Sequence, residues 1–168
     1  MVCDYDPAWP ALFEQERTRL QHVLGSMVLT IEHVGSTAVP GLAAKPVIDL
    51  LVGVRSLTEA RSRCTEPLQA LGYAYLAEYE SWLPGEMLFR KGAPGPWTHH
   101  VHVMEPSGAR WEELILIRDY FRRHRETASA YASLKRALAL VFEEDIAGYR
   151  NAKRPFLQAV LAKARAER

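Results

Sequence analysis

The segment that decides the fold runs from His33 to Val54 and reads H-V-G-S-T-A-V-P-G-L-A-A-K-P-V-I-D-L-L-V-G-V. Gly35, Ser36 and Thr37 lie ahead of an apolar run that contains Asp49. Such a turn either closes the chain in the ordinary way or aims backbone N–H groups at a phosphate, because glycine allows close approach of the backbone. A carboxylate inside an apolar strand is costly to bury alone, so Asp49 needs a partner or a metal ion. We therefore expect phosphate and divalent-metal chemistry here.

The residues on either side of this segment predict a mixed α/β architecture. A helix is expected before Gly25, capped by Asp4 or Asp6 with Pro7 in its first turn. Period-two or continuous apolar patterns predict strands, and helical spacing predicts one further helix at 57–71. The expected strands lie at 27–34, 46–54, 73–80, 86–91 and 98–105. After Pro106 only helical spacing remains, which predicts three closing helices.

Length and composition indicate one domain. The chain has 168 residues, of which 48% are apolar and 24% charged, so it can bury one sizeable core. We expect a single domain over 1–168, with a mostly antiparallel or mixed sheet at about 26–105 and helices at about 109–166. The two cysteines have no metal-binding spacing, and no apolar run is long enough to span a membrane. A cytoplasmic location without membrane contact is the expectation.

The net charge of +1 conceals an asymmetry between the two parts of the chain. Residues 1–104 carry eight Lys/Arg against eleven Asp/Glu, or −3, whereas residues 105–168 carry thirteen against nine, or +4. Basic residues mixed with acids along helices are typical of a solvated surface. The charge therefore does not favour a nucleic-acid partner, and the sequence leaves the oligomeric state open.

A second group of polar residues lies in W-T-H-H-V-H-V-M-E, residues 97–105. Strand alternation places His100 and His102 on one face with Met104, and Glu105 on the other. The two imidazoles either share a metal with Asp49 or are simply hydrogen-bonded. Histidine and aspartate together suit Zn, Mn or Fe(II), whereas Mg²⁺ prefers oxygen ligands. His33 is either a further residue of the same pocket or an ordinary strand residue.

Several cationic and aromatic residues are candidates for contact with an anion. Lys45 reaches a phosphate or the Asp49 carboxylate, or else is an exposed loop lysine, and Arg90 either neutralises the same anion or is solvated. Tyr149 and Lys153, one helical turn apart, either meet the ligand or cover the edge of the core. The remaining aromatic candidates are interpreted as packing residues: Trp82, Trp97 and Trp111.

The order of several short segments resembles the GrpB (UPF0157-type) family along nearly the whole chain. These are Y-D-P-A-W, E-H-V-G-S-T-A-V-P-G-L-A-A-K-P-V-I-D-L, T-H-H-V-H-V, I-R-D-Y-F-R, Y-A-S-L-K and Y-R-N-A-K. The core of that family is similar to the nucleotidyltransferase fold of the DNA polymerase β superfamily. The resemblance implies that Gly35 and Ser36 form the Gly-Ser turn for a nucleoside triphosphate, and that Asp49 is the first metal-binding carboxylate. It also implies a supporting role in some members, which are fused to dephospho-CoA kinase.

One position departs from the superfamily pattern. The second carboxylate of that pattern, two residues after the first, is Leu51 in this chain. Two-metal nucleotidyl transfer therefore requires a ligand from His100, His102 or Glu105. Three functions follow: metal-dependent nucleotide binding or nucleotidyl transfer to an unknown acceptor, binding of a nucleotide or phosphorylated metabolite without catalysis, and metal-dependent hydrolysis. The cofactor expected is a divalent ion, Mg, Mn or Zn.

Overall fold

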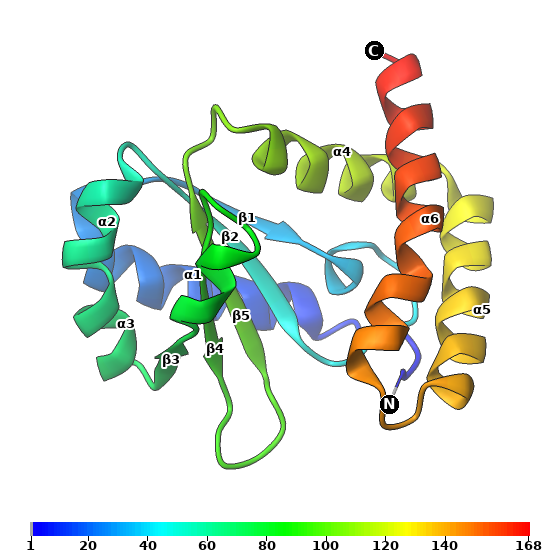
Figure 1. Cartoon of the computed structure of the whole chain (residues 1–168), viewed down its shortest axis with the longest axis horizontal. Coiled ribbons are helices and arrows are strands. Elements are labelled where there is room, and N and C mark those ends of the chain that lie inside the picture. The colour runs from blue at the N-terminus through cyan, green and yellow to red at the C-terminus, as the bar shows by residue number, and fades with distance from the viewer. Residues whose placement is uncertain (1) are drawn as a thin grey trace.

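The computed structural model describes residues 2–168 and contains one five-stranded mixed sheet (Figure 1). The strand order is β1-β2-β5-β4-β3; β2 and β5 are parallel, and every other neighbouring pair is antiparallel. The strands are β1 (Val28–Val34), β2 (Ile48–Val54), β3 (Tyr73–Tyr75), β4 (Met87–Lys91) and β5 (His99–Met104). The predicted mixed α/β architecture is confirmed, and the segment that contains Asp49 forms an inner strand.

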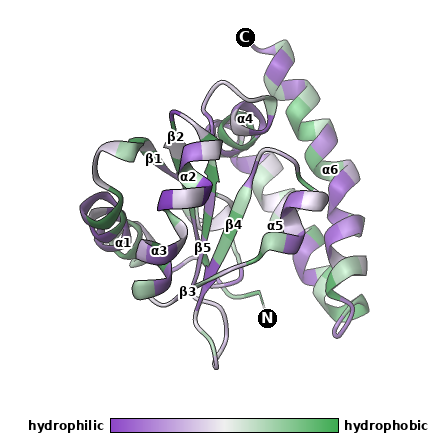
Figure 2. Cartoon of the chain, turned by 60° about the vertical axis from the view of Figure 1, so that its left-hand side comes forward, coloured by the Kyte–Doolittle hydropathy of each residue, from purple (hydrophilic) through white to green (hydrophobic). Residues whose placement is uncertain are grey.

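Six α-helices surround the sheet (Figure 1). They are α1 (Trp9–Leu24), α2 (Leu57–Arg63), α3 (Thr65–Ala70), α4 (Ala109–Arg123), α5 (Arg125–Val141) and α6 (Ile146–Ala166). Helices α1 to α3 pack on one face, and α4 packs on the other with α5 and α6 beside it. The three closing helices were predicted correctly. Helix α6 carries hydrophobic and hydrophilic residues along its whole length (Figure 2), so it can pack and still present polar groups.

The main core lies between the sheet and α1 to α3. Alternate residues of β2, namely Leu50 and Val52, point into it and are fully buried. On the opposite face Leu51 is also fully buried, packed with Val34 and Met104 beneath α4. Burial on both faces explains why β2 is a nearly continuous apolar run rather than an alternating one.

Ion pairs tie the outer helices to the sheet. The Glu16 side chain of α1, only 1% exposed, accepts hydrogen bonds from Tyr73 Oη and Lys91 Nζ, both at 2.8 Å. On the other face, Arg118 of α4 donates to Glu32 of β1 at 2.7 Å. A buried carboxylate with several donors is compensated for its lost hydration, so these contacts fix how the helices sit on the sheet.

Three predicted elements differ from the structure. Helix α1 begins only at Trp9, because Asp6 accepts the N–H of Ala8 in a turn before the helix. The helix expected at 57–71 is split into α2 and α3, because Pro67 cannot donate a backbone hydrogen bond and is tolerated only in the first turn of a helix. The strand expected at 73–80 ends at Tyr75, and a 3₁₀ helix, Ala77–Ser81, follows.

Within residues 2–168, none of the helices combines the length and the apolar character that crossing a bilayer would require.

Candidate functional site

Three predicted metal ligands meet on the face of the sheet that α4 partly covers. Asp49 of β2 pairs in register with His100 of β5, and His102 lies two residues further along the same face. His100 Nδ1 lies 3.1 Å from Asp49 Oδ1, and His102 Nε2 lies 3.7 Å from the same oxygen. One ligand atom from each residue lies within 4.8 Å of the other two. The predicted grouping of these side chains on one face is therefore found in the structure.

The buried carboxylate of Glu86 is hydrogen-bonded to His102 on the side of the ring away from Asp49. Glu86 is 3% exposed, and its Oε1 lies 2.5 Å from His102 Nδ1. Burial alone would lower the pKa of His102, but the hydrogen bonds to Asp49 and Glu86 outweigh it and raise that pKa to about 9. Burial likewise opposes ionisation of Asp49, yet its hydrogen bonds to His100 and His102 hold its pKa well below the ordinary value. The two carboxylates therefore favour the protonated form of the His102 imidazole.

The residues present fit a transition-metal ion. Two imidazoles and one carboxylate form a nitrogen-rich donor set, which suits Zn, Mn or Fe(II) better than Mg²⁺. The carboxylate of Glu86 orients His102 as outer partners of metal-binding histidines do. Among the described residues His100 Nε2 is buried without a hydrogen-bond partner, a polar atom that the protein alone does not satisfy.

The second carboxylate of the two-metal pattern has no replacement among the residues considered. Leu51 is packed in the core beneath α4 and contributes no ligand atom. Glu105, considered as a substitute from the sequence, is wrong for this role: its Oε1 accepts the N–H of Leu57 at 3.0 Å, at the start of α2. The cluster consequently offers ligands for one metal ion.

The Gly-Ser turn lies directly against Asp49. Gly35 has φ +73°, and a Cβ added there would lie 2.3 Å from Asp49 Oδ2. Only glycine meets both conditions, the left-handed backbone and the close carboxylate. The next residue, Ser36, begins the 3₁₀ turn Ser36–Ala38 that the sequence places after β1.

A buried lysine from a distant helix reaches this turn. Lys135 of α5 is 3% exposed; its Nζ donates to Ser36 Oγ at 2.9 Å and to the Ala43 carbonyl at 2.5 Å. Burial, assisted by the charges of Lys153 and Arg136, lowers the pKa of Lys135 to about 7. Sequence reasoning missed this residue, although it ends the segment Y-A-S-L-K; its helical spacing gave no sign of the turn that it contacts.

Three further predicted residues gather near Lys135, whose pKa the charge of Lys153 helps to lower. The Nζ atoms of Lys45 and Lys153 lie 4.6 Å and 4.2 Å from the centroid of the Tyr149 ring. Burial and the charge of Lys45 lower the pKa of Lys153 to about 8, while Asp49 acts in the opposite direction. Neighbouring ammonium groups repel one another, and an anion placed among them would relieve this repulsion and part of the hydration that Lys153 has lost.

Two predicted residues, His33 and Arg90, lie apart from Lys45, Lys153 and Tyr149. His33 faces α1, where its ring stacks on Phe13 with centroids 4.6 Å apart and its Nε2 lies 3.0 Å from Thr37 Oγ1. Burial lowers its pKa to about 4, so it is neutral at pH 7. The Thr37 hydroxyl also donates to the Val47 carbonyl at 3.2 Å. Because the hydroxyl is engaged in these two contacts, the backbone N–H is the group through which Thr37 can meet a ligand at the turn. His33 thus reaches the turn through Thr37 from the side of α1, and its role in the pocket stays a prediction.

Arg90 lies on the same face as His100, its partner in β4–β5 pairing, but its side chain turns away from the Gly-Ser turn. Its Nη2 donates to Tyr79 Oη at 3.0 Å, and its guanidinium lies over the rings of Tyr79 and Trp97. Arg90 therefore borders the cluster on the side remote from Ser36.

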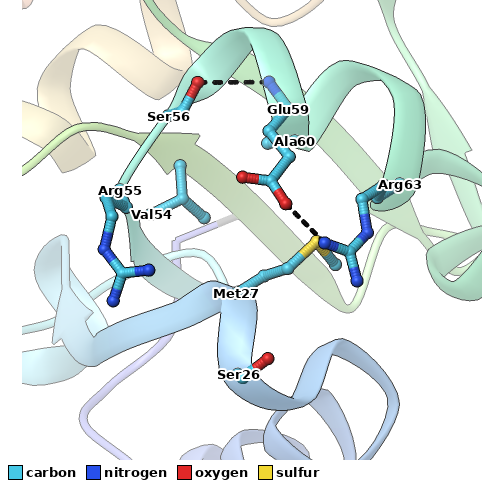
Figure 3. A pocket seen from close by; sticks show the side chains of 8 residues that line it. All are labelled: Ser26, Met27, Val54, Arg55, Ser56, Glu59, Ala60 and Arg63. Carbon is cyan, nitrogen blue, oxygen red and sulfur yellow. Dashed lines mark hydrogen bonds and ion pairs between the residues drawn. The ribbon is translucent and has the colours of Figure 1, made fainter.

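A separate shallow hollow of about 250 Å³ lies at the other end of β2 (Figure 3). Two of its charged residues, Glu59 and Arg63, pair with each other, and the Glu59 N–H is capped by Ser56 Oγ at 3.2 Å. It shares no residue with the Asp49 cluster and offers no metal-binding group of three.

Sequence comparison identifies relatives of the whole domain. The family model described as GrpB protein matches residues 1–163. The chain is 40% identical over 145 residues to UPF0157 protein YqkA of Bacillus subtilis, and this match covers 86% of the chain but only 41% of YqkA. It is 29% identical over 181 residues to a dephospho-CoA kinase of Mycolicibacterium paratuberculosis, with 95% of the chain and 44% of the kinase covered. The domain thus spans less than half the length of these two relatives.

Two solved structures place the fold. The conserved protein GrpB from Enterococcus faecalis is similar with a TM-score of 0.89 and 34% identity, over 98% of this chain and 96% of that one. The RNA terminal uridylyl transferase Cid1 is similar with a TM-score of 0.53 and 17% identity, over 82% of this chain and 43% of that one. At this identity the likeness to Cid1 concerns the fold alone, which is nucleotidyltransferase-like.

Proposed function

The chain belongs to the GrpB family and has a nucleotidyltransferase-like fold; on this premise we propose that it binds a nucleoside triphosphate with one divalent metal ion and transfers a nucleotidyl group to an acceptor. One observation carries the proposal. A group of lysines around the Gly-Ser turn lies beside the cluster of Asp49, His100 and His102. An anion site next to a metal-ligand set is what phosphoryl chemistry requires.

Each residue has a role that follows from its contacts. The backbone N–H groups of Ser36 and Thr37, with the ammonium of Lys135, bind the outer phosphates of the nucleotide. Lys45 and Lys153 neutralise the charge that the departing pyrophosphate carries. Gly35 contributes by admitting the Asp49 carboxylate to the turn.

Asp49, His100 and His102 would hold the metal, with Glu86 orienting His102. A divalent ion bound there supplies charge neutralisation and Lewis acidity at the α-phosphate. His102 would bind the ion only in its deprotonated form, so affinity for the ion should fall as pH falls. Tyr149 holds the two lysines in place through contacts with its ring face.

Nucleotide binding without transfer is the second candidate, and the buried Leu51 favours it. A single metal position leaves either the attacking or the leaving oxygen without its own ion. The partial likeness to a dephospho-CoA kinase is compatible with such a module supporting an attached enzyme. Hydrolysis of the nucleotide, with water as the acceptor, is the third.

Thermal unfolding tests the proposal. With Mn²⁺ or Zn²⁺ and a non-hydrolysable nucleoside triphosphate, we expect the melting temperature to rise by several degrees, because a ligand that binds only the folded state stabilises it. Asp49→Asn should abolish the rise, whereas Asp4→Asn, at an exposed position, should retain it. Absence of any nucleotide-dependent rise in the wild type would overturn the proposal. With a hydrolysable nucleotide, release of pyrophosphate supports transfer, release of phosphate supports hydrolysis, and release of neither supports binding alone.

A further inference from the structure

A large groove lies beside the proposed nucleotide site and is not explained by it. The groove has a volume of about 850 Å³, within the range of small-molecule sites. Its walls are the segment from the 3₁₀ helix Ala77–Ser81 to Leu83 on one side, and α4 and α6 on the other. Figure 1 shows the chain between β3 and β4 on the same side of the sheet as α6.

The lining combines free positive charge with apolar surface. Arg150 and Arg154 of α6 line the groove, and among residues 2–168 neither has a carboxylate partner within salt-bridge distance. The other two arginines of the groove, Arg110 and Arg165, each lie 3.6 Å from Glu113, and Arg110 also lies 3.7 Å from the buried Glu86. The groove thus carries an excess of guanidinium groups, which favour carboxylates and phosphates.

An exposed aromatic ring completes the lining. Trp82, interpreted from the sequence as a packing residue, is 74% exposed and lines the groove. The aliphatic side chains of Ile117, Leu157 and Leu161 line the apolar part. A tryptophan beside free arginines matches a ligand that joins an anionic group to a planar or apolar body.

The position of the groove relative to the nucleotide site suggests which ligand enters. Across the sheet the order is the Gly-Ser turn after β1, then Asp49 on β2, His100 on β5 and Arg90 on β4. Tyr79, which lines the groove, receives hydrogen bonds from Arg90 at 3.0 Å and from Arg150 at 3.4 Å. The groove therefore adjoins the Asp49 cluster on its β4 side, through Arg90 and Tyr79, whereas the turn adjoins it on its β1 side.

In-line displacement uses these two sides differently. The acceptor oxygen forms a bond to the α-phosphorus and loses its proton to water, while the bond from that phosphorus to the pyrophosphate oxygen breaks. With the pyrophosphate held at Ser36 and Lys135, the acceptor must approach from the opposite side, where the groove lies.

We propose that this groove is the acceptor site, and that the acceptor is a small molecule carrying an anionic group on a planar or apolar body. That the bound molecule accepts a nucleotidyl group rests on the proposed function, whereas binding of such a molecule in the groove does not depend on it. Two carboxylates in the lining, Glu78 and Glu113, and the aliphatic wall favour a small amphipathic anion over a polynucleotide, whose successive phosphates would meet those acids.

The probe for the groove is 1-anilinonaphthalene-8-sulfonate, an aromatic anion whose fluorescence rises on transfer from water. We expect one molecule to bind per chain, with energy transfer from tryptophan that Trp82→Ala diminishes. Arg154→Ala should weaken binding about tenfold, the loss of one charge-assisted hydrogen bond. Lys163→Ala, which removes an equal charge from an exposed position outside the groove on α6, should not. The neutral analogue N-phenyl-1-naphthylamine should bind more weakly than the sulfonate.

Three further measurements make the result decisive. Asp49→Asn should leave dye binding unchanged, so failure of the nucleotide site and failure of the groove are distinguishable. Bound nucleotide analogue with Mn²⁺ should not displace the dye; competitive displacement would assign the groove to the nucleotide itself and overturn the acceptor site. Displacement by a single-stranded RNA oligomer at concentrations far below those of a mononucleotide would overturn the small-molecule acceptor. Dye binding that is absent, or unchanged in both the Arg154 and Trp82 variants, would overturn the groove as a site.

Discussion

Gly35 and Asp49 touch: a Cβ on the glycine would lie 2.3 Å from Oδ2 of the carboxylate. The contact joins the end of β1 to the start of β2. Val34, the residue before Gly35, pairs with Asp49 across these two strands. The turn that would bind phosphate and the carboxylate that would bind metal are therefore one rigid unit, and a change in either displaces the other.

Gly35→Ala should disrupt the site more than it disrupts the fold. The backbone of Gly35, with φ +73° and ψ −171°, costs about 1–3 kcal/mol for a residue with a Cβ, and the clash adds a displacement of Asp49. The matched control is Gly41→Ala, because Gly41 has φ +79° but nothing within 4 Å of an added Cβ. We expect similar backbone costs by urea unfolding, but loss of the Mn²⁺-dependent rise in melting temperature only for Gly35→Ala. Equal metal responses in the two variants would contradict the contact.

Lys135→Met should separate binding from stability. Removing a buried charge that has no carboxylate partner among the described residues relieves its lost hydration, so we expect an unchanged or higher melting temperature at pH 6. Affinity for a nucleoside triphosphate should fall at least tenfold, the equivalent of about 1.4 kcal/mol. Isothermal titration calorimetry measures this, with exposed Lys163→Met as the control. Undiminished affinity would remove Lys135 from the site.

The same lysine predicts the direction of a pH effect. Its pKa in the folded chain, about 7, lies below the ordinary value of 10.5 that applies in the unfolded chain. Between these values the unfolded chain binds more protons, so unfolding free energy rises with pH. We expect the wild type to gain stability relative to Lys135→Met from about pH 7 to about pH 10. Urea unfolding at several pH values checks this, and parallel curves for the two proteins would refute it.

Glu16 should be essential for the attachment of α1, in contrast to its neighbour Glu14. Glu16→Gln removes a buried charge that is bonded to Tyr73 and Lys91, and breaking such a network typically costs about 3 kcal/mol or more. Glu14 forms only an exposed pair with Arg17, so Glu14→Gln should cost less than about 0.5 kcal/mol. Urea unfolding gives both values.

The pKa of Glu16 adds a pH signature. Burial opposes its ionisation, but the hydrogen bonds from Lys91, Tyr73 and Arg19 outweigh it and lower the pKa below the ordinary value. Its contribution is therefore present above the ordinary pKa and is lost as pH falls through the folded-state value. The difference between wild type and Glu16→Gln should shrink in acid, and a constant difference would count against the network.

The local patterns predicted the part of the site that lies on strands. The alternation of His100, Val101 and His102 fixes which side chains share a face, and the apolar run around Asp49 identifies an inner strand. Both depend only on neighbours in the chain, so they are readable without tertiary structure. The family resemblance supplied the meaning of the Gly-Ser turn.

Contacts between distant segments escaped prediction. Lys135 reaches Ser36 across 99 residues, and Glu86 reaches His102 from the turn before β4. The residues next to Lys135 and Glu86 in the sequence do not distinguish either side chain from an ordinary surface charge. The misplaced strand after Tyr75 has a similar origin. A bond from the Tyr75 hydroxyl to Glu80 closes the chain into a turn, which overrides the strand preference of the aromatic Tyr75 and Tyr79.

Helix α6 presents two adjacent rows of side chains to two different places. Tyr149 and Lys153 face the lysine-rich turn, while Arg150 and Arg154, each one residue later, line the groove. Any tilt or rotation of this single helix moves both rows together. A ligand that shifted the helix on occupying one place would change affinity at the other, and by reciprocity the second ligand would change affinity for the first by the same factor.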